Sequence, residues 1–166
     1  MISIITLTYN NFDDLRRTLN SLEKIEDIEK IVINGGYCSK TRDYLNNFDG
    51  IAISEPDKGI SDAFNKGVSQ SNGENVMFLN SGDVLLSPDY LQEAEKIIKF
   101  NPEISFVHSD LVFEDRISGD IRLTAMQPFF FKAPPLGRGM PYHHQSTPQI
   151  RKRLLLPNHT GLLQRQ

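Results

Sequence analysis

The stretch NVMFLNSGD, residues 75–83, joins a short apolar run to an abrupt polar break. Residues 75–79 have the length and composition of a buried strand, and residues 80–83 have the composition of the turn that ends it. Gly82 permits a tight turn in which a ligand can approach the backbone closely. The stretch therefore predicts a buried strand whose end carries the carboxylate of Asp83 in a polar loop.

Four other short apolar runs repeat this pattern, at residues 3–8, 30–33, 51–53 and 104–107. Between the runs lie segments with helical spacing of apolar side chains or with helix-start residues, at residues 13–25, 39–47, 60–70 and 88–100. We expect Asp13 or Asp14 to cap the first of these helices. Short strands that are apolar on both faces and alternate with helices predict an α/β fold, with a mostly parallel central sheet flanked by helices.

The alternation ends after the fifth apolar run. Residues 111–114 and 121–124 flank a turn-forming segment and predict a small β-hairpin after the fifth strand. Residues 127–148 hold five of the nine prolines and are expected to be irregular. We therefore divide the chain into a core domain, residues 1–125, and a remaining segment, residues 126–166.

Composition and charge narrow the classes of function. The hydrophobic fraction of 39% and the charged fraction of 23% are ordinary for a globular protein, and no run approaches the roughly 18 apolar residues that span a bilayer. The N-terminus has no basic region and no cleavage site of a signal peptide, which favours a cytoplasmic location. The single cysteine, Cys38, excludes an internal disulfide, and the net charge of −3 argues against a nucleic-acid partner.

Polar breaks follow three of the expected strands, at residues 8–10, 34–36 and 80–83. In parallel sheets of this kind, ligands bind beyond the carboxyl ends of the strands, so these breaks locate a candidate site. A lone carboxylate such as Asp83 suits a divalent cation that also holds a diphosphate, although it can equally cap its own turn.

Residues 55–67 form a polar loop that leads into the start of an expected helix, a geometry suited to phosphate or ribose groups. Lys58 adds a cation to this loop, and Asp57 and Asp62 add hydrogen-bond acceptors. By composition alone, the loop is also compatible with an ordinary helix cap.

Taken together, these motifs resemble the family 2 glycosyltransferases. The resemblance extends over five segments in order, residues 4–10, 31–36 followed by Thr41, 55–67, 78–83, and His144-Gln145-Ser146. Residues 55–67 are close to the pattern of a bacterial subgroup that builds capsule-like and colanic-acid-like surface polysaccharides. The resemblance implies a GT-A Rossmann-like fold and transfer, with inversion, of a sugar from a nucleotide-diphosphate donor.

The resemblance also implies roles for individual residues. Asp83 would bind Mg²⁺ or Mn²⁺ at the diphosphate, Thr8 and Asn34 would line the base pocket, and Asp62 would lie near the nucleoside. The full set expected to bind the nucleotide sugar is Thr8, Tyr9, Asn34, Gly35, Asp57, Lys58, Gly59, Asp62 and Ser81. His144 would lie by the diphosphate or the metal; a packed loop histidine is the alternative.

The sequence departs from the family pattern at three points. Asn34 and Ser81 stand where the family usually has Asp, and the first change weakens the case for a UDP-sugar. No Asp or Glu follows Asp120, so the downstream carboxylate that the family uses as general base is absent. Asp110 is then the candidate base, and residues 126–166 would be a partial, truncated acceptor-side segment.

Three readings remain open. The first is a metal-dependent glycosyltransferase of bacterial surface-polysaccharide biosynthesis that uses a saccharide or lipid-linked acceptor. The second is a module that binds the nucleotide sugar without transfer. The third, a sugar nucleotidyltransferase, is disfavoured because residues 8–12 are not a glycine-rich, basic loop. The basic residues of 151–153 beside three leucines suit either peripheral contact with the inner membrane or contact with the acidic core.

Overall fold

The computed structural model describes residues 1–104, 106–107, 111–115, 117–124 and 130–132. Its helices are α1 (Phe12–Asn20), α2 (Ser39–Leu45), α3 (Ile60–Gln70) and α4 (Asp89–Phe100). Its strands are β1 (Ile2–Thr8), β2 (Ile28–Asn34), β3 (Ile51–Ser54), β4 (Asn75–Phe78), β5 (Leu111–Glu114), β6 (Ile121–Thr124) and β7 (Phe130–Lys132).

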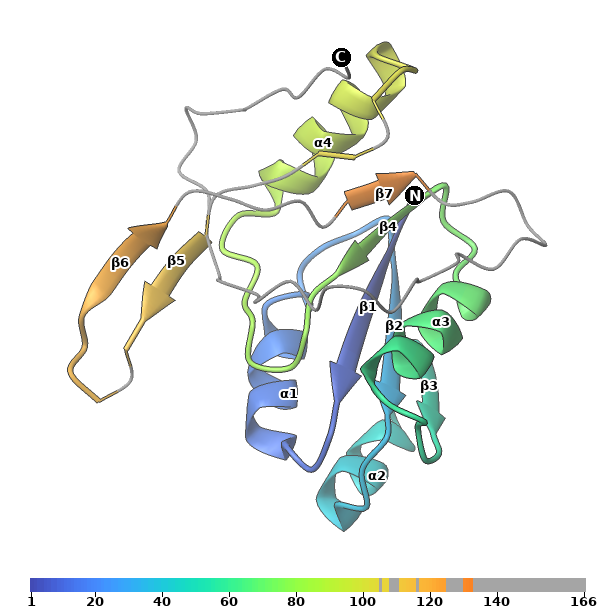
Figure 1. Ribbon diagram of the computed structural model, residues 1–166, viewed down its shortest axis with the longest axis vertical. Coiled ribbons are helices and arrows are strands. Elements are labelled where there is room, and N and C mark those ends of the chain that lie inside the picture. Colours follow the sequence, from blue (N-terminus) through green and yellow to red (C-terminus); the bar gives the residue numbers. More distant parts are fainter. Residues whose placement is uncertain (105, 108–110, 116, 125–129, 133–166) are drawn as a thin grey trace.

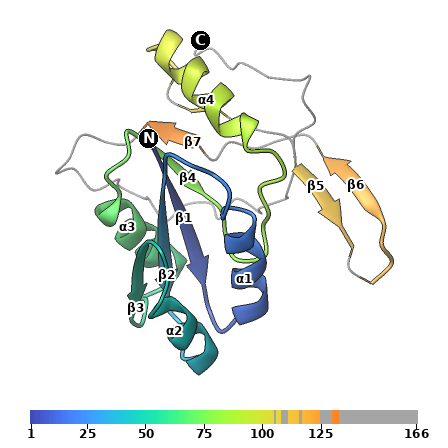
Figure 2. The ribbon, with the colours of Figure 1, turned by 180° about the vertical axis from the view of Figure 1, so that it is seen from behind.

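Within the described residues, the central sheet has five strands in the order β3-β2-β1-β4-β7 (Figure 1). The pairs β1–β2, β1–β4 and β2–β3 are parallel, and β7 runs antiparallel to β4 at one edge. The α/β fold with a mostly parallel sheet is therefore confirmed. Viewed from behind in Figure 2, α3 lies on one side of the sheet and α1 on the other.

Alternation of side chains along the strands divides the core into two layers. Ile2, Ile4 and Val32 face the layer that contains buried side chains of α1, α2 and α4, such as Leu15, Leu45 and Ala94. The other face packs on α3, and its buried members are Ile5, Ile31, Ile33, Ala63, Val76 and Phe78. Both faces of the central strands are covered, which explains their continuous apolar sequences.

The described residues of the fifth apolar run, 104, 106 and 107, do not lie in the expected strand. Ile104 and Val107 lie outside any strand, and Val107 packs into the core with 6% of its surface exposed. A short apolar run that is buried without pairing cannot be told from a strand by its sequence pattern. The edge position beside β4 is taken instead by β7, from a segment that we expected to be irregular.

The first helix also differs from the expected one. It begins at Phe12 rather than at a cap formed by Asp13 or Asp14, and turns replace its expected last residues, 21–24. Asn11 precedes the helix, and its Nδ2 donates to Asp14 Oδ2 at 2.7 Å. The carboxylate therefore acts in the first turn, where it is favourable to the helix dipole.

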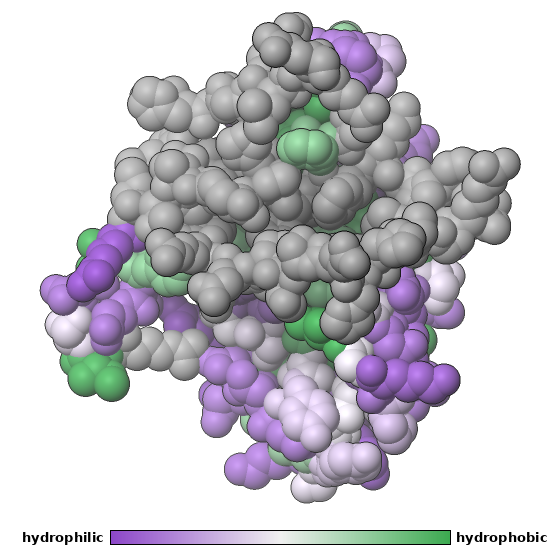
Figure 3. All heavy atoms as spheres, in the orientation of Figure 1, coloured by the Kyte–Doolittle hydropathy of each residue, from purple (hydrophilic) through white to green (hydrophobic). Residues whose placement is uncertain are grey.

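The expected hairpin is confirmed as the antiparallel pair β5–β6. Its turn is held by Asp115 Oδ1, which accepts from the backbone N–H groups of Ile117 and Ser118 at 2.8 and 3.0 Å. Ile117 is fully exposed, and an apolar group is visible at the tip of the hairpin in Figure 3. One side-chain pair, Arg17–Glu114 at 2.9 Å, links the hairpin to α1.

The carboxyl ends of the parallel strands β1 to β4 lie together at one end of the sheet, the lower end in Figure 1. We call this end, with the loops that follow the strands, the carboxyl edge. The surface around this edge is mainly hydrophilic in Figure 3. None of the helices in the described part of the chain is long and apolar enough to cross a membrane.

Candidate functional site

The loops that follow β1 and β2 are bound to each other at the carboxyl edge. The N–H of Gly35 donates to the carbonyl oxygen of Thr8 at 3.2 Å. Asn10, which has a φ of 51°, accepts at its Oδ1 from the backbone N–H groups of Tyr37 and Cys38 at 2.7 and 3.0 Å. These bonds hold the loop residues 9–10 and 35–38 together at the carboxyl edge, and we call these residues the rim. Two aromatic side chains stand on this rim, Tyr9 and Tyr37, with 66% and 64% of their surfaces exposed.

Asn34, at the end of β2, is completely buried and makes two internal hydrogen bonds. Its Oδ1 accepts from the N–H of Gly36 at 3.1 Å, and its Nδ2 donates to Ser54 Oγ at 3.2 Å. Because the atom that faces a backbone N–H has to be an acceptor, the orientation of this amide is determined. Asn34 therefore ties β2 to β3, and its oxygen is already in use.

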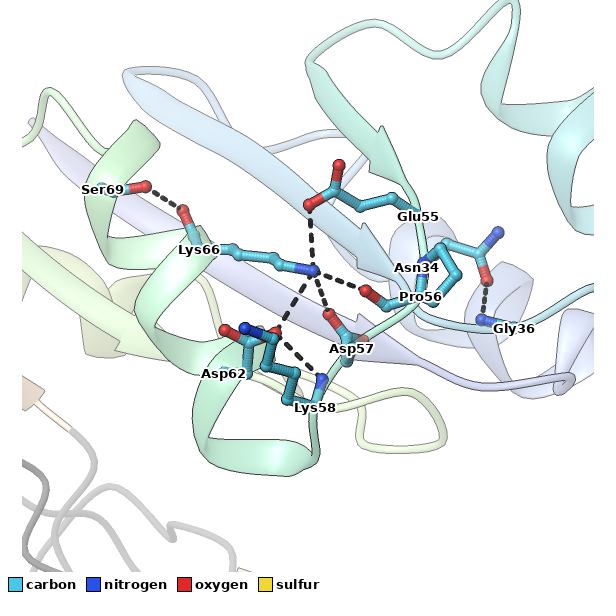
Figure 4. A network of polar contacts seen from close by, with 9 residues as sticks. All are labelled: Asn34, Gly36, Glu55, Pro56, Asp57, Lys58, Asp62, Lys66 and Ser69. Carbon is cyan, nitrogen blue, oxygen red and sulfur yellow. Dashed lines mark hydrogen bonds and ion pairs between the residues drawn. The ribbon is translucent and has the colours of Figure 1, made fainter.

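The loop between β3 and α3 is organised around the ammonium group of Lys66 (Figure 4). Lys66 Nζ lies 2.9 Å from Glu55 Oε1, 2.8 Å from Asp57 Oδ1 and 3.4 Å from Asp62 Oδ2. It also donates to the carbonyl oxygen of Pro56 at 2.9 Å. One lysine thus contacts three carboxylates from the end of a strand, a loop and the first turn of a helix.

Protonation in this cluster follows from those contacts. The carboxylates of Asp57 and Glu55 raise the pKa of Lys66 well above its usual range. The backbone N–H of Lys58, which donates to Asp62 Oδ2 at 3.0 Å, lowers the pKa of Asp62, and Lys66 lowers it further. Asp62 also lies at the N-terminal, positive end of α3. From the sequence we expected this helix start to suit a phosphate or a ribose group, and the structure places a carboxylate of the protein there.

Asp57 connects this cluster to the rim. A Cβ atom added at Gly35 would lie 2.1 Å from Asp57 Oδ2, so any larger residue at this position would have to displace this carboxylate. The side chain of Asp57 is 14% exposed and its other oxygen contacts Lys66. The end of β2 and the loop before α3 are therefore in close contact through one carboxylate.

The loop after β4 approaches the same edge. The N–H of Ser81 donates to the carbonyl oxygen of Leu7 at 3.1 Å, and the N–H of Gly82 donates to Thr18 Oγ1 at 2.9 Å. Gly82 has a φ of 97°, a conformation that favours glycine, and Asp83 follows it. Among the described residues, Asn80 Oδ1 and Thr8 Oγ1 are buried at this edge without a hydrogen-bond partner.

The structure places ten of the twelve expected site residues at the carboxyl edge or in the loops beside it. Thr8 and Asn34 are register partners, Gly35 contacts Asp57, and Lys58 binds Asp62. The set at this edge is Thr8, Tyr9, Asn34, Gly35, Asp57, Lys58, Gly59, Asp62, Ser81 and Asp83. The two candidate catalytic residues, Asp110 and His144, lie outside the described residues.

Sequence reasoning assigned no role to Lys66, Glu55 or Asn10. The four-residue spacing of Asp62 and Lys66 on one helix was a signal for their contact. No local signal indicated that Glu55 and Asp57 would reach the same ammonium group, or that Asn10 would accept from two N–H groups of another loop.

The chain matches the model of glycosyl transferase family 2 over residues 3–156. It belongs to glycosyltransferase family 2. Among its relatives in this family, an uncharacterised glycosyltransferase of Mycobacterium tuberculosis is 35% identical over 130 residues, which cover 72% of this chain and 50% of the relative. A PGL/p-HBAD biosynthesis glycosyltransferase of Mycobacterium bovis is 29% identical over 120 residues, 68% of this chain and 47% of the relative. This family member spans about half the length of these curated relatives.

Solved structures support the GT-A Rossmann-like fold of this family 2 member. A mannosyltransferase from Pyrobaculum calidifontis, in complex with GDP-Man and Mn²⁺, matches with a TM-score of 0.60 and 17% identity, over 66% of this chain and 35% of that chain. S. aureus TarS in complex with UDP-GlcNAc matches with a TM-score of 0.57 and 22% identity, over 72% and 36%. At these identities the likeness establishes the fold alone.

Proposed function

We propose that this chain binds a nucleotide-diphosphate sugar at the carboxyl edge of its sheet. We further propose that it transfers the sugar, with inversion, to a saccharide or lipid-linked acceptor in bacterial surface-polysaccharide biosynthesis. The observation that carries the proposal is the position of three carboxylates in this family 2 chain. Asp57 in the loop before α3, Asp62 in the first turn of α3 and Asp83 in the loop after β4 all follow the carboxyl ends of parallel strands, where such sheets bind ligands.

Charge gives the donor an orientation. The cluster has three carboxylates, those of Glu55, Asp57 and Asp62, around the one ammonium group of Lys66, so its excess negative charge repels a diphosphate. The cluster suits the nucleoside part of the nucleotide sugar, because ribose hydroxyls and base N–H groups are uncharged and can donate hydrogen bonds to carboxylates. The exposed ring of Tyr9 offers a face on which a base can stack. The diphosphate then extends toward Asp83.

The residues at Asp83 fit a divalent cation. No three His, Cys, Asp or Glu side chains converge on one point among the described residues, so a fully protein-bound cation is not built there. Mg²⁺ is commonly held by one or two carboxylates together with substrate phosphates, and Asp83 satisfies that requirement. When bound, Mg²⁺ or Mn²⁺ would stabilise the leaving diphosphate as a Lewis acid. The carboxylate and the diphosphate have the same sign of charge, which is the physical reason for a cation between them.

The general base and the role of His144 stay predictions. Asp110 is the candidate base, and His144 the candidate partner of the diphosphate or metal. Nucleotide-sugar binding without transfer is the alternative. Release of UDP or GDP from a nucleotide sugar, in a reaction that depends on an added acceptor, separates the two.

Calorimetric titration with UDP and GDP, with and without Mn²⁺, tests donor binding. We expect Mn²⁺ to strengthen binding of one nucleotide by about tenfold, equivalent to about 1.4 kcal/mol, and Asp83→Ala to remove this enhancement. The matched control is Glu74→Ala, because Glu74 is an exposed carboxylate just before β4, at the opposite end of the strand that leads to Asp83. An Mn²⁺ enhancement that survives in Asp83→Ala would remove the metal role from this residue.

A further inference from the structure

Lys66 lies at the centre of the carboxylate cluster between β3 and α3, and its pattern in the sequence indicated no role. Its side chain is 19% exposed, and its ammonium group makes four contacts of 2.8 to 3.4 Å with Glu55, Pro56, Asp57 and Asp62. An ammonium group has three hydrogens, so these contacts occupy its donor capacity. Lys66 therefore has no hydrogen left for a donor phosphate, unlike a lysine that binds a ligand directly.

The partners of Lys66 extend over the whole segment from the end of β3 to the first turn of α3, residues 55–62. Glu55 directly follows β3, Asp57 packs over Gly35 at the end of β2, and Asp62 lies in the first turn of α3 (Figure 4). Asp62 in turn accepts from the backbone N–H of Lys58. The conformation of residues 55–62 thus depends on one ammonium group, placed one helical turn after Asp62 on α3.

We propose that Lys66 is a positioning residue that holds Glu55, Asp57 and Asp62 as a preformed set of hydrogen-bond acceptors for the nucleoside of the donor. This inference rests on the proposed function and concerns the same site. Without the ammonium group, the three carboxylates repel one another and the loop has to be ordered when the ligand binds. The residue acts through its neighbours and does not touch the donor.

The test compares UDP and GDP affinities of the parent chain, Lys66→Met and the control Lys30→Met. Lys30 is matched because its side chain is also 19% exposed and its ammonium group pairs with a carboxylate, that of Asp49, at 3.0 Å. Neither residue belongs to the cluster around Lys66. We expect Lys66→Met to bind the preferred nucleotide about tenfold more weakly, because a loop that was preorganised now loses freedom on binding. Lys30→Met should bind like the parent.

Two further readouts separate positioning from a general loss of structure. Lys66→Met should keep the parent's ratio of affinities with and without Mn²⁺, because that ratio depends on Asp83. The loss of nucleotide affinity in Lys66→Met, relative to the parent, should also be smaller at pH 5.5 than at pH 8. A proton shared among Glu55, Asp57 and Asp62 can replace the missing positive charge. Lys58 is the other charged group near Asp62 and is unchanged in this variant. In the parent, contacts keep Lys66 charged and Asp62 ionised over this range.

The outcomes are distinguishable. If the parent binds neither UDP nor GDP, the proposed function fails and this inference fails with it. If the parent binds and Lys66→Met binds equally well, only the inference is overturned. If Lys66→Met does not fold, the charge-matched variant Lys66→Met with Glu55→Gln replaces it. Weak nucleotide binding by that variant, at a thermal stability close to the parent's, supports the inference, and parent-like binding overturns it.

Discussion

Gly35 shows how one missing side chain shapes the candidate site. Its N–H group donates to Thr8, and the space where a Cβ would stand is filled by the carboxylate of Asp57. A larger residue at this position would have to displace a carboxylate that is also held by Lys66. The close approach of two loops is therefore a property of glycine at position 35.

We expect Gly35→Ala to weaken nucleotide binding and to lower the free energy of unfolding by about 1–3 kcal/mol, because the added methyl overpacks the contact. Urea denaturation and calorimetric titration measure the two effects. The double variant with Asp57→Ala is the control, since the nearest Asp57 atom would then be its Cβ at 3.5 Å, an ordinary contact. Its loss of stability should be smaller than the sum of the single losses. Simple additivity would show that the contact with Asp57 is not the cause.

At the scale of elements, Glu29 on β2 joins this strand to β1 and to the loop before β4, at the amino ends of the strands. Its Oε2 accepts from Ser3 Oγ on β1 at 2.5 Å and from the backbone N–H of Asn72, ahead of β4, at 2.8 Å. Its Oε1 accepts from Asn72 Nδ2 at 2.7 Å. Partial burial opposes ionisation of Glu29, but the hydrogen bonds from Asn72 and Ser3 outweigh it and lower the pKa of this carboxyl.

A carboxylate whose pKa is lower in the folded state stabilises the fold above its unfolded pKa, about 4.3 for Glu. That contribution is lost as the pH falls through the folded pKa. We therefore expect Glu29→Gln to lower the free energy of unfolding by about 1 kcal/mol at pH 7. The NH₂ group of glutamine would face hydrogen-bond donors of Ser3 or Asn72, where the carboxylate oxygen now accepts. The difference from the parent should shrink as the pH falls below about 4.3 and vanish in acid below the folded pKa of Glu29. Denaturation curves at both pH values measure it, and an equal difference at both would contradict the role of ionisation.

At the scale of the whole molecule, apolar burial rather than surface charge holds the layers together. Leu15 on α1 is completely buried in the layer beneath the sheet. Arg17, two residues later, pairs with Glu114 of the hairpin, but the two side chains are 44% and 56% exposed. Exposed pairs of this kind contribute little and are screened by salt.

The two residues give a direct comparison. We expect Leu15→Ala to lower the free energy of unfolding by about 2–5 kcal/mol through a cavity in the core. Arg17→Ala should lower it by less than about 1 kcal/mol, and only at low salt. Chemical denaturation of both variants at low and high salt checks this. A loss from Arg17→Ala that is as large as that from Leu15→Ala would mean that the hairpin contributes to the stability of the main body.

The sequence by itself determined the four parallel strands and the helices between them, because buried strands and amphipathic helices have local apolar patterns. It also located the candidate site, because parallel strands with polar breaks bring those breaks to one edge. The family assignment followed from motifs within these same loops. Ile104 and Val107 were wrongly predicted to lie in a strand, because an apolar run that is buried without pairing has the same sequence pattern as a strand.

Only the tertiary structure decided which distant groups meet. β7 completes the sheet edge beside β4, Asp57 packs over Gly35, and Lys66 collects three carboxylates. The amide of Asn34 is likewise occupied by Gly36 and Ser54, which no local pattern indicates. The physical reason is that apolar periodicity acts over a few residues. Edge pairing, charge clusters and close loop contacts depend instead on how separate segments of the chain are brought together by the packing of the core.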